Sequence, residues 1–260
     1  MMPTPLATLH VTTFNIHKGF SHFNARMMVH ELRERLRHVG PDVVFLQEVQ
    51  GLHLKHAKKH HNWPTDPQHE FLAEGTWRAT AYGKNVVYDH GHHGNAILSH
   101  FPLLHSENHD VTDLWFERRG MLHCALEVPG LAVPLHCVCV HLSLLARSRA
   151  KQLDGLVERL AELAPGDSPL LIAGDFNDWQ NRGHGLVAER LGMTEVFSGE
   201  GTGPARSFPS WKPTLRLDRI YARGFDVQST AVHADAEWAR LSDHAALSAV
   251  LTPRPDLRSP

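Results

Sequence analysis

Apolar residues in this chain cluster in short runs that end in polar side chains, a pattern typical of strands that close at the edge of a sheet. Six of these runs predict strands, over residues 9 to 15, 42 to 48, 94 to 99, 131 to 141, 169 to 177 and 215 to 221. The runs follow one another more closely between residues 77 and 141, which indicates antiparallel hairpins in that part of the chain.

Two segments between these strands have helical periodicity. One helix is predicted over about 24 to 38, where Met28, Leu32 and Leu36 lie on one side and Gly40 and Pro41 follow as a stop signal. Another is predicted over about 147 to 164, where five apolar residues share one face at intervals of three and four: Leu153, Leu156, Val157, Leu160 and Leu163. Helices interleaved with strands predict layers of sheet covered by helices.

Two segments are more polar than the rest. Residues 51 to 70 include the histidines at 53, 56, 60 and 61, and we expect a solvated surface segment; a helix there would instead align the histidines as a metal-binding stripe. The last residues, from about 252 to 260, are rich in proline and charge and are expected to form a frayed tail.

The bulk composition is that of a globular protein. With 260 residues, 42% of them hydrophobic and 21% charged, the chain can bury a sizeable core, and we expect one domain over residues 1–260. The three cysteines (Cys124, Cys137 and Cys139) have no framework spacing, so structural disulfides are not expected. Cys137 and Cys139 lie two apart in an apolar run and are interpreted as small buried side chains on one face of a strand.

The formal net charge of −2 argues against the global basic field of a non-specific nucleic-acid binder, although it leaves room for a local basic patch. Histidine is unusually frequent, with 22 residues, so the net charge should become positive below a pH of about 6.5. Binding to polyanions is therefore expected to strengthen in mild acid.

The first residues lack a basic leader followed by a long apolar stretch, and nowhere do about 18 apolar residues follow one another. We expect a soluble, cytoplasmic protein with no integral membrane segment, and the sequence indicates no obligate protein partner.

Several predicted strands end in, or are interrupted by, side chains that could perform metal-assisted chemistry. They are Asn15, Glu48, Asp175, Asn177, Asp218, Asp243 and His244. Hard divalent cations such as magnesium take oxygen ligands, and one or two strand-end carboxylates are suited to that role. Taken singly the signals are weak, because an Asp after a strand is more often a helix cap or a turn residue.

The order of these motifs is more specific than any one of them. The succession N-I-H-K-G, L-Q-E-V, G-N-A-I-L-S, V-H-L, G-D-F-N-D, L-D-R-I-Y and S-D-H, over residues 13 to 244, resembles the endonuclease/exonuclease/phosphatase superfamily, and most closely its short bacterial members. That superfamily includes deoxyribonuclease I, AP endonucleases, inositol polyphosphate 5-phosphatases and neutral sphingomyelinases. The resemblance implies a four-layer α/β/β/α sandwich, in which two mixed β-sheets pack face to face.

The resemblance also implies roles for the site residues. Glu48 would be the principal ligand of Mg2+, with Mn2+ able to take its place, and Asn15 and Asp243 would complete the shell. Asp175 would orient or deprotonate the attacking water, and Asn177 would donate to a phosphoryl oxygen. His244 would hold the phosphate while Asp218 accepts its other ring proton, and a carboxylate so placed raises the pKa of a histidine.

His141 is the most informative position for subtype. Its V-H-L motif matches the members that end this strand in a histidine, as deoxyribonuclease I and the sphingomyelinases do, rather than the N-x-Y-x-P-N pattern of the AP endonucleases. There the histidine contacts the phosphate and can act as general acid to the leaving oxygen. The alternative for His141 is a satisfied core histidine.

Other positions leave two interpretations open. Asn95 fits the family's G-N-A motif and could tie the site together, or it could be a turn residue. Arg119 and Arg118, beside Trp115 and Phe116, could clamp phosphate and stack on a base or face lipid, or they could form a solvated loop. His17 and Lys18 lie either near the phosphate or on the surface.

Three functions fit the sequence. The first choice is a Mg2+-dependent phosphodiesterase that acts on DNA or RNA, with a phospholipid head group as the other diester. The second is a phosphomonoesterase for a small molecule, although the basic residues typical of the inositol phosphatases are not recognisable. The third is a binding protein without activity, which is disfavoured because Glu48, Asp175 and His244 are all present.

Overall fold

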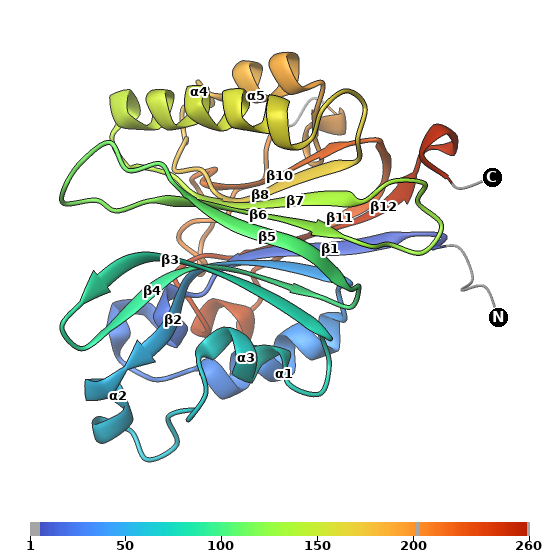
Figure 1. Ribbon diagram of the computed structural model, residues 1–260. Coiled ribbons are helices and arrows are strands. Elements are labelled where there is room, and N and C mark those ends of the chain that lie inside the picture. Colours follow the sequence, from blue (N-terminus) through green and yellow to red (C-terminus); the bar gives the residue numbers. More distant parts are fainter. Residues whose placement is uncertain (1–5, 201–202, 259–260) are drawn as a thin grey trace.

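The fold consists of two six-stranded sheets packed face to face, with helices on both outer faces (Figure 1). The computed structural model describes residues 6–200 and 203–258. The first sheet has the order β11-β12-β1-β2-β4-β3 and the second the order β5-β6-β7-β8-β10-β9. The four-layer sandwich with two mixed sheets is therefore confirmed.

The bounds of the elements are as follows. The first sheet contains β1 (Leu9–Asn15), β2 (Val43–His53), β3 (Ala79–Tyr88), β4 (Gly91–Ser99), β11 (Phe225–His233) and β12 (Ala246–Pro253). The second contains β5 (Leu103–Asp110), β6 (Gly120–Leu126), β7 (Leu135–His141), β8 (Leu170–Asp175), β9 (Thr194–Glu195) and β10 (Asp218–Arg223). The helices are α1 (Val29–Val39), α2 (Leu54–Lys59), α3 (Gln68–Ala73), α4 (Ala146–Leu163) and α5 (His184–Leu191). Short 3-10 turns lie at His17–Gly19, His22–Asn24, Ser198–Glu200, Trp238–Arg240 and Pro255–Leu257.

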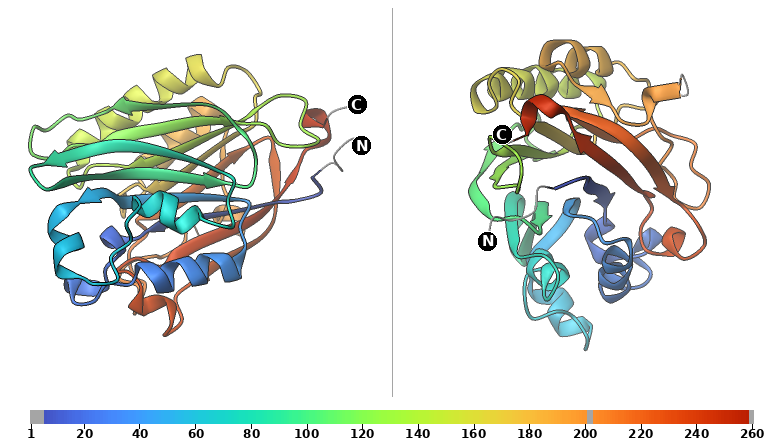
Figure 2. Two further views of the ribbon diagram at one scale, coloured as in Figure 1. Left: turned by 60° about the horizontal axis from the view of Figure 1, so that its bottom comes forward. Right: turned by 90° about the vertical axis from the view of Figure 1, so that its right-hand side faces the viewer.

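Both sheets have the same pattern of pairing. Each has one parallel pair near its centre, β1 with β2 and β7 with β8, and all other neighbours are antiparallel. Two parallel strands need a crossover connection, which α1 and α4 provide on opposite outer faces. In Figure 2 these two helices lie on either side of the paired sheets. As a result, the carboxyl ends of both parallel pairs can meet at one end of the sandwich.

Three apolar layers hold the sandwich together. The middle layer lies between the sheets and includes Val11, Phe45 and Cys139. The outer layers place α1 and α3 against the first sheet, and α4 and α5 against the second. All three cysteines are buried and unpaired, and Cys137 and Cys139 lie in the middle layer, which confirms the interpretation of small core side chains.

The helix predicted over 24 to 38 was wrong at its beginning. It starts at Val29, after a short 3-10 turn, because Phe20 and Met27 form a bridge that holds the preceding segment in an extended turn. The strands predicted at 131 and 215 begin later, at Leu135 and Asp218. The helix predicted over 147 to 164 and the hairpins between 77 and 141 are confirmed.

The frayed tail predicted from residue 252 was wrong for residues 252–258, and the last two residues lie outside the described part. Strand β12 continues to Pro253, and the turn after it buries the Leu257 side chain. Leu257 packs against Gly224, where an added Cβ would lie 2.3 Å from a Leu257 methyl carbon. The polar stretch from 51 to 70 is largely exposed around α2, as expected.

Burial changes the expected titration of the histidines. Desolvation is the leading cause that lowers the pKa of His69 and of His123 to about 4, and it also lowers the pKa of His10, His92, His136 and His233. Fewer histidines therefore become charged between pH 6.5 and 5 than the sequence predicted. The expected gain in polyanion binding is correspondingly smaller.

These buried histidines predict a loss of stability in mild acid. An unfolded histidine takes up a proton near pH 6.5, whereas folded His69 does so only near pH 4. The unfolded state binds more protons between these values, so the free energy of unfolding falls as pH decreases from 6.5 to 4, by about 1 to 2 kcal/mol per such residue at pH 5. Urea unfolding at pH 7 and pH 5 measures it.

His69→Phe keeps a ring that can stack on Tyr82, 4.6 Å away between centroids, and removes the titrating group. The variant should lose less stability than the wild type between pH 7 and pH 5. An equal loss in both proteins would contradict the assignment of this effect to His69.

Candidate active site

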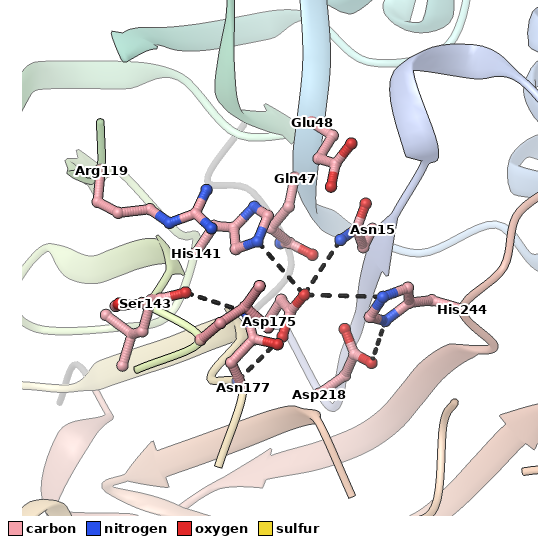
Figure 3. A network of polar contacts seen from close by, with 12 residues as sticks. Asn15, Gln47, Glu48, Arg119, His141, Ser143, Asp175, Asn177, Asp218 and His244 are labelled. Atoms are coloured by element: carbon pink, nitrogen blue, oxygen red, sulfur yellow. Dashed lines mark hydrogen bonds and ion pairs between the residues drawn. The ribbon is translucent and has the colours of Figure 1, made fainter. Parts of the chain in front are cut away.

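Asp175 lies at the centre of a polar cluster at one end of the sandwich (Figure 3). Its Oδ2 atom accepts a hydrogen bond from Nδ2 of Asn15 at 3.1 Å, and lies 3.5 Å from Nε2 of His141 and 3.7 Å from Nε2 of His244. Its Oδ1 accepts a hydrogen bond from the backbone N–H of Asn177 at 3.0 Å. One buried carboxylate thus receives donors from both sheets.

The fold explains why these residues meet. Asn15 and His141 end the first strand of each parallel pair, and Asp175 ends β8, directly beside His141 in the register. Asp218 begins β10, which is antiparallel to β8 and pairs with Asp175. His244 comes just before β12, the antiparallel neighbour of β1. Strands of either direction therefore deliver their site residues to the same end.

His244 and Asp218 form a buried ion pair. Nδ1 of His244 lies 2.8 Å from Oδ2 of Asp218, and both side chains are almost fully buried. Burial by itself would lower the pKa of His244, but the carboxylates of Asp218 and Asp175 outweigh it and raise the pKa to about 10. His244 is therefore an imidazolium at neutral pH, held in one orientation.

Asp175 has the opposite tendency. Burial is the largest effect on its carboxyl group and raises its pKa to about 6, with Asp218 adding to the rise and His244 opposing it. The carboxylate is therefore ionised at neutral pH but close to its titration, which is the condition that favours a general base.

His141 remains neutral at physiological pH, because burial, followed by the positive charge of Arg119, holds its pKa well below the usual value. Figure 3 shows the Arg119 side chain beside the His141 ring. Glu117 fixes Arg119 through a 2.9 Å ion pair and also accepts a hydrogen bond from the hydroxyl of Ser143. The loop before β6 and the loop after β7 are joined in this way.

Glu48 lies near His141 and Lys18. Burial by itself would raise the pKa of its carboxyl group, but His141, Lys18 and His17 outweigh it and lower the pKa to about 2, and because His141 is neutral at physiological pH, Lys18 is the cation that acts there. Lys18 Nζ is 3.3 Å from Oε2 of Glu48, an atom with no other partner among the described residues. The carboxylate is therefore ionised at neutral pH and has capacity for a further ligand.

Backbone strain is concentrated at the same place. Glu48 (φ 56°), Asn177 (φ 51°), His17 (φ 44°) and Lys18 (φ 58°) all lie in the left-handed region, which side chains other than glycine rarely adopt. In β2 this coincides with a register shift between Leu46 and Val49. Such conformations persist only where the surrounding structure enforces them, and they are frequent at functional sites.

The remaining predicted residues are placed as follows. Oδ1 of Asp243 lies 3.8 Å from Nδ1 of His17, and the backbone N–H of His17 donates to Oδ1 of Asn15. Asp243 and His17 therefore lie next to Asn15. Asn177 donates from Nδ2 to the carbonyl oxygen of Leu142 at 3.0 Å. Asn95 lies within β4 rather than in a turn, and its Nδ2 donates to the carbonyl oxygens of Gly120 and Cys139 in the opposite sheet. Asn95 therefore joins the two sheets, and substrate contact by it stays a prediction.

Sequence reasoning missed several residues that support this cluster. Ser242 donates to the carbonyl oxygen of Asn15 at 2.7 Å and so connects the His244 segment to β1. Gln47 is fully buried and donates to Thr13 and Cys139. Arg219 is buried beside Asp178, behind the end of β8. A small hydroxyl or a charged residue in a sequence gives no signal for such support, because most residues of these types lie on the surface.

Within the described part of the chain, Asp175, Asp218 and His244 form a buried group whose ligand atoms lie within 4.8 Å of one another. Three such side chains can hold a metal ion. Both ring nitrogens of His244, however, already face carboxylates, and a cation between them would have to displace the proton shared with Asp218. The group is thus equally suited to holding an imidazolium.

A family model described as endonuclease/exonuclease/phosphatase family matches residues 12–244. The chain belongs to this family. It is a phosphoesterase family, and the match spans every predicted site residue. The expected family membership and enzyme class are confirmed.

Relatives and solved structures agree with this assignment. The chain is 45% identical over 239 residues to the uncharacterized protein YbhP of Escherichia coli K12, covering 92% of this chain and 94% of the relative. An endonuclease/exonuclease/phosphatase structure from Beutenbergia cavernae has a TM-score of 0.74 at 20% identity, covering 96% of this chain and 72% of the other. The mannosyl-6-phosphatase Bt3783 of Bacteroides thetaiotaomicron has a TM-score of 0.71 at 16% identity, covering 94% and 99%. These structural matches show the fold alone.

No helix in residues 6–200 or 203–258 is long and apolar enough to cross a membrane.

Proposed function

We propose that this protein is a Mg2+-dependent phosphodiesterase that hydrolyses nucleic acid by in-line attack of a water molecule. The observation that carries the proposal is the arrangement around Asp175, where a carboxylate with a pKa of about 6 faces an imidazolium with a pKa of about 10. A base and a cation so close together can activate water and hold a phosphate anion at the same time.

The residues around Glu48 fit a magnesium ion. Its carboxylate is ionised, and apart from Lys18 at 3.3 Å its Oε2 atom has no partner among the described residues. Asp243 and the side-chain oxygen of Asn15 supply two more hard oxygen donors nearby, which is the donor type that Mg2+ prefers. Bound magnesium, or Mn2+ in its place, would polarise the phosphoryl group.

The chain's own side chains then divide the remaining work. Asp175 orients the attacking water and takes its proton, while His244 holds a phosphoryl oxygen and Asp218 keeps its ring in place. Asn177, which has one side-chain hydrogen bond to Leu142, donates its remaining N–H to the oxygen on which charge builds. His141 lies on the opposite side of Asp175 from His244, where the N–H of its neutral ring can donate a hydrogen bond to the leaving oxygen.

The surface around the site favours a nucleic-acid substrate. Exposed apolar side chains lie on loops that join the site residues, and we call them the rim: Trp115, Phe116, Leu144, Leu145, Trp179 and Trp211. Exposed cations accompany them, on the same loops for Arg118, Arg182 and Lys212 and in the first turn of α4 for Arg147. Aromatic faces stack on unpaired bases while cations contact the phosphate backbone, a combination found in proteins that bind single strands.

The loops of the rim are fixed to one another. The backbone N–H of Leu144 donates to Glu117 at 3.2 Å, which joins the loop of Trp115 to the loop after β7. The Arg149 guanidinium lies 5.5 Å from the centroid of the Trp179 ring. The backbone N–H of Ser210 donates to the carbonyl oxygen of Asp243 at 2.7 Å, which brings the loop of Trp211 to the site. Arg119 lies inside this rim, where it could contact the substrate.

The same rim gives a phospholipid head group as the second candidate substrate, because Trp115 is 83% exposed and Phe116 63% exposed, as side chains that enter a lipid interface are. Turnover of single-stranded DNA, supercoiled plasmid and phospholipid vesicles should be compared in Mg2+. Faster cleavage of single-stranded DNA supports the first proposal. Cleavage of vesicle lipid alone, or of a small phosphomonoester such as mannose 6-phosphate alone, would overturn it.

Glu48→Gln tests the metal assignment. The amide keeps the size of the side chain but removes the charge that attracts Mg2+, so the magnesium concentration at half-maximal rate should rise at least about tenfold. Titration of the rate with Mg2+ measures this. Glu70→Gln, an exposed position on α3, provides a matched control that should behave as wild type. An unchanged titration for Glu48→Gln would remove Glu48 from the metal site.

A further inference from the structure

A second cluster of metal-ligating side chains lies far from Asp175, on the outer face of the second sheet. His105, Glu107 and His109 alternate along the edge strand β5, so all three project from one face. Glu107 pairs in register with His123 of β6 on the same face. The two β5 histidines thus lie beside the Glu107 carboxylate, and His123 is its cross-strand neighbour.

Two distances approach those of a metal site, although the ligand atoms of the whole cluster are not gathered within 4.8 Å of one another as those of Asp175, Asp218 and His244 are. Nε2 of His109 lies 3.4 Å, and Nε2 of His105 3.8 Å, from Oε2 of Glu107. Two ligand atoms bound to tetrahedral zinc at about 2.0 to 2.2 Å are roughly 3.4 Å apart. The His105 side chain is 61% exposed, so its ring can turn the remaining distance toward Glu107.

His123 supplies an oriented fourth donor. Its Nε2 lies 3.0 Å from Nδ1 of His136 on β7, while its buried Nδ1 makes no hydrogen bond to any described residue. Nε2 of His109 is also buried and, among residues 6–200 and 203–258, without a hydrogen-bond partner. A metal-ligating histidine typically uses its second ring nitrogen in a hydrogen bond of this kind, which fixes the ring.

The charges at the cluster also fit a cation. Glu107 supplies a carboxylate donor, and the His109 side chain beside it is only 17% exposed. Arg159 of α4 lies 3.7 Å from Oε2 of Glu107 and competes with a metal ion for this carboxylate. Arg159 also reaches Glu162 at 2.6 Å, so it has another carboxylate to pair with when a metal binds Glu107.

Solvent can reach the cluster. His109 and Arg159 line an open cavity of about 380 Å³ between the end of β5 and α4. We propose that His105, Glu107, His109 and His123 form a binding site for a divalent transition metal, specifically Zn2+, separate from the magnesium site. Three imidazoles and one carboxylate are a donor set that zinc accepts and magnesium does not favour.

Zinc binding is tested by calorimetric titration of Zn2+ into the full chain, with excess Mg2+ present to compete at the Asp175 end. Glu107→Gln and His109→Asn should each weaken Zn2+ binding at this site about 10- to 100-fold, and His136→Gln about tenfold. Arg159→Gln should strengthen binding several-fold, because it removes the competing cation and leaves all four ligands in place. A variant that unfolds can only lose Zn2+ affinity, so a gain of affinity in Arg159→Gln distinguishes an effect on the site from an effect on folding.

The matched control is His56→Asn combined with His60→Asn, at the histidines of the exposed segment around α2. Its zinc titration should equal that of the wild type. Unchanged affinity in Glu107→Gln, unchanged or weaker affinity in Arg159→Gln, or loss of the binding event in the α2 control would overturn the proposal. The readout is binding, so failure of the proposed nuclease activity would not affect it.

Discussion

Replacing Asp175 with asparagine should lower turnover by about 10²- to 10⁴-fold while the protein stays folded. The amide cannot accept the proton of the attacking water, and although it has the same shape, its one oxygen can accept from Asn15 or from the backbone N–H of Asn177 but not from both. Burial raises the pKa of this carboxyl group to about 6. At pH 7 the group is ionised, and this buried charge lowers the free energy of unfolding. Thermal stability should therefore be unchanged or higher in Asp175→Asn.

The matched control is Glu195→Gln. Glu195 is another buried carboxylate whose pKa burial raises, on β9, and it pairs with Tyr221 three positions along β10 from Asp218. Its substitution should leave turnover unchanged. Steady-state rates and thermal unfolding of both variants test the assignment. Near-wild-type turnover in Asp175→Asn would exclude it as the base, and unfolding of that variant would indicate a structural role instead.

Asp218→Asn should change the pH dependence of turnover as well as its size. In the wild type, the rate should rise as Asp175 loses its proton near pH 6; bound magnesium would move this rise to a lower pH. The rate should fall again as His244 loses its proton near pH 10. Asp218 is the largest of the effects that raise the pKa of His244. Without its charge, burial dominates, and the alkaline fall should move toward neutral pH.

At pH 8 the Asp218→Asn variant should therefore be slower by about 10²-fold or more, with part of the activity recovered near pH 6. Profiles of kcat and kcat/KM from pH 5 to 10 measure this shift. A uniform loss at every pH would show that Asp218 only supports the fold. A profile of wild-type shape would show that His244 acts without it.

The apolar runs predicted sheets covered by helices because several buried strands carry strong signals, while the four-layer sandwich was implied by the resemblance of the ordered motifs to the family. β8, with the sequence LLIAGD, is a nearly continuous apolar run, as is typical of a strand buried on both faces. The edge strands β5 and β11 were missed, because most of their side chains are exposed and their sequences resemble loops. The same polar character in β5 supplies the histidines of the proposed zinc site.

Membership of the active site could be predicted from the order of the motifs, but the contacts could not. Asn15 and Asp175 are 160 residues apart, and only the packing of two sheets brings their side chains within 3.1 Å. The left-handed backbone at Glu48 had no signal in a sequence that reads as an ordinary strand. The pKa values of His244 and Asp175 depend on burial, which a motif does not encode.

The most direct test of the account is nicking of supercoiled plasmid by the purified protein in Mg2+ and in chelator, with His244→Ala prepared in parallel to reveal contaminating nucleases. We predict nicking that requires Mg2+ and is lost in His244→Ala. Nicking that survives in that variant or in chelator would contradict the proposed site. An intact plasmid, together with intact single-stranded DNA, would contradict the proposed nuclease activity.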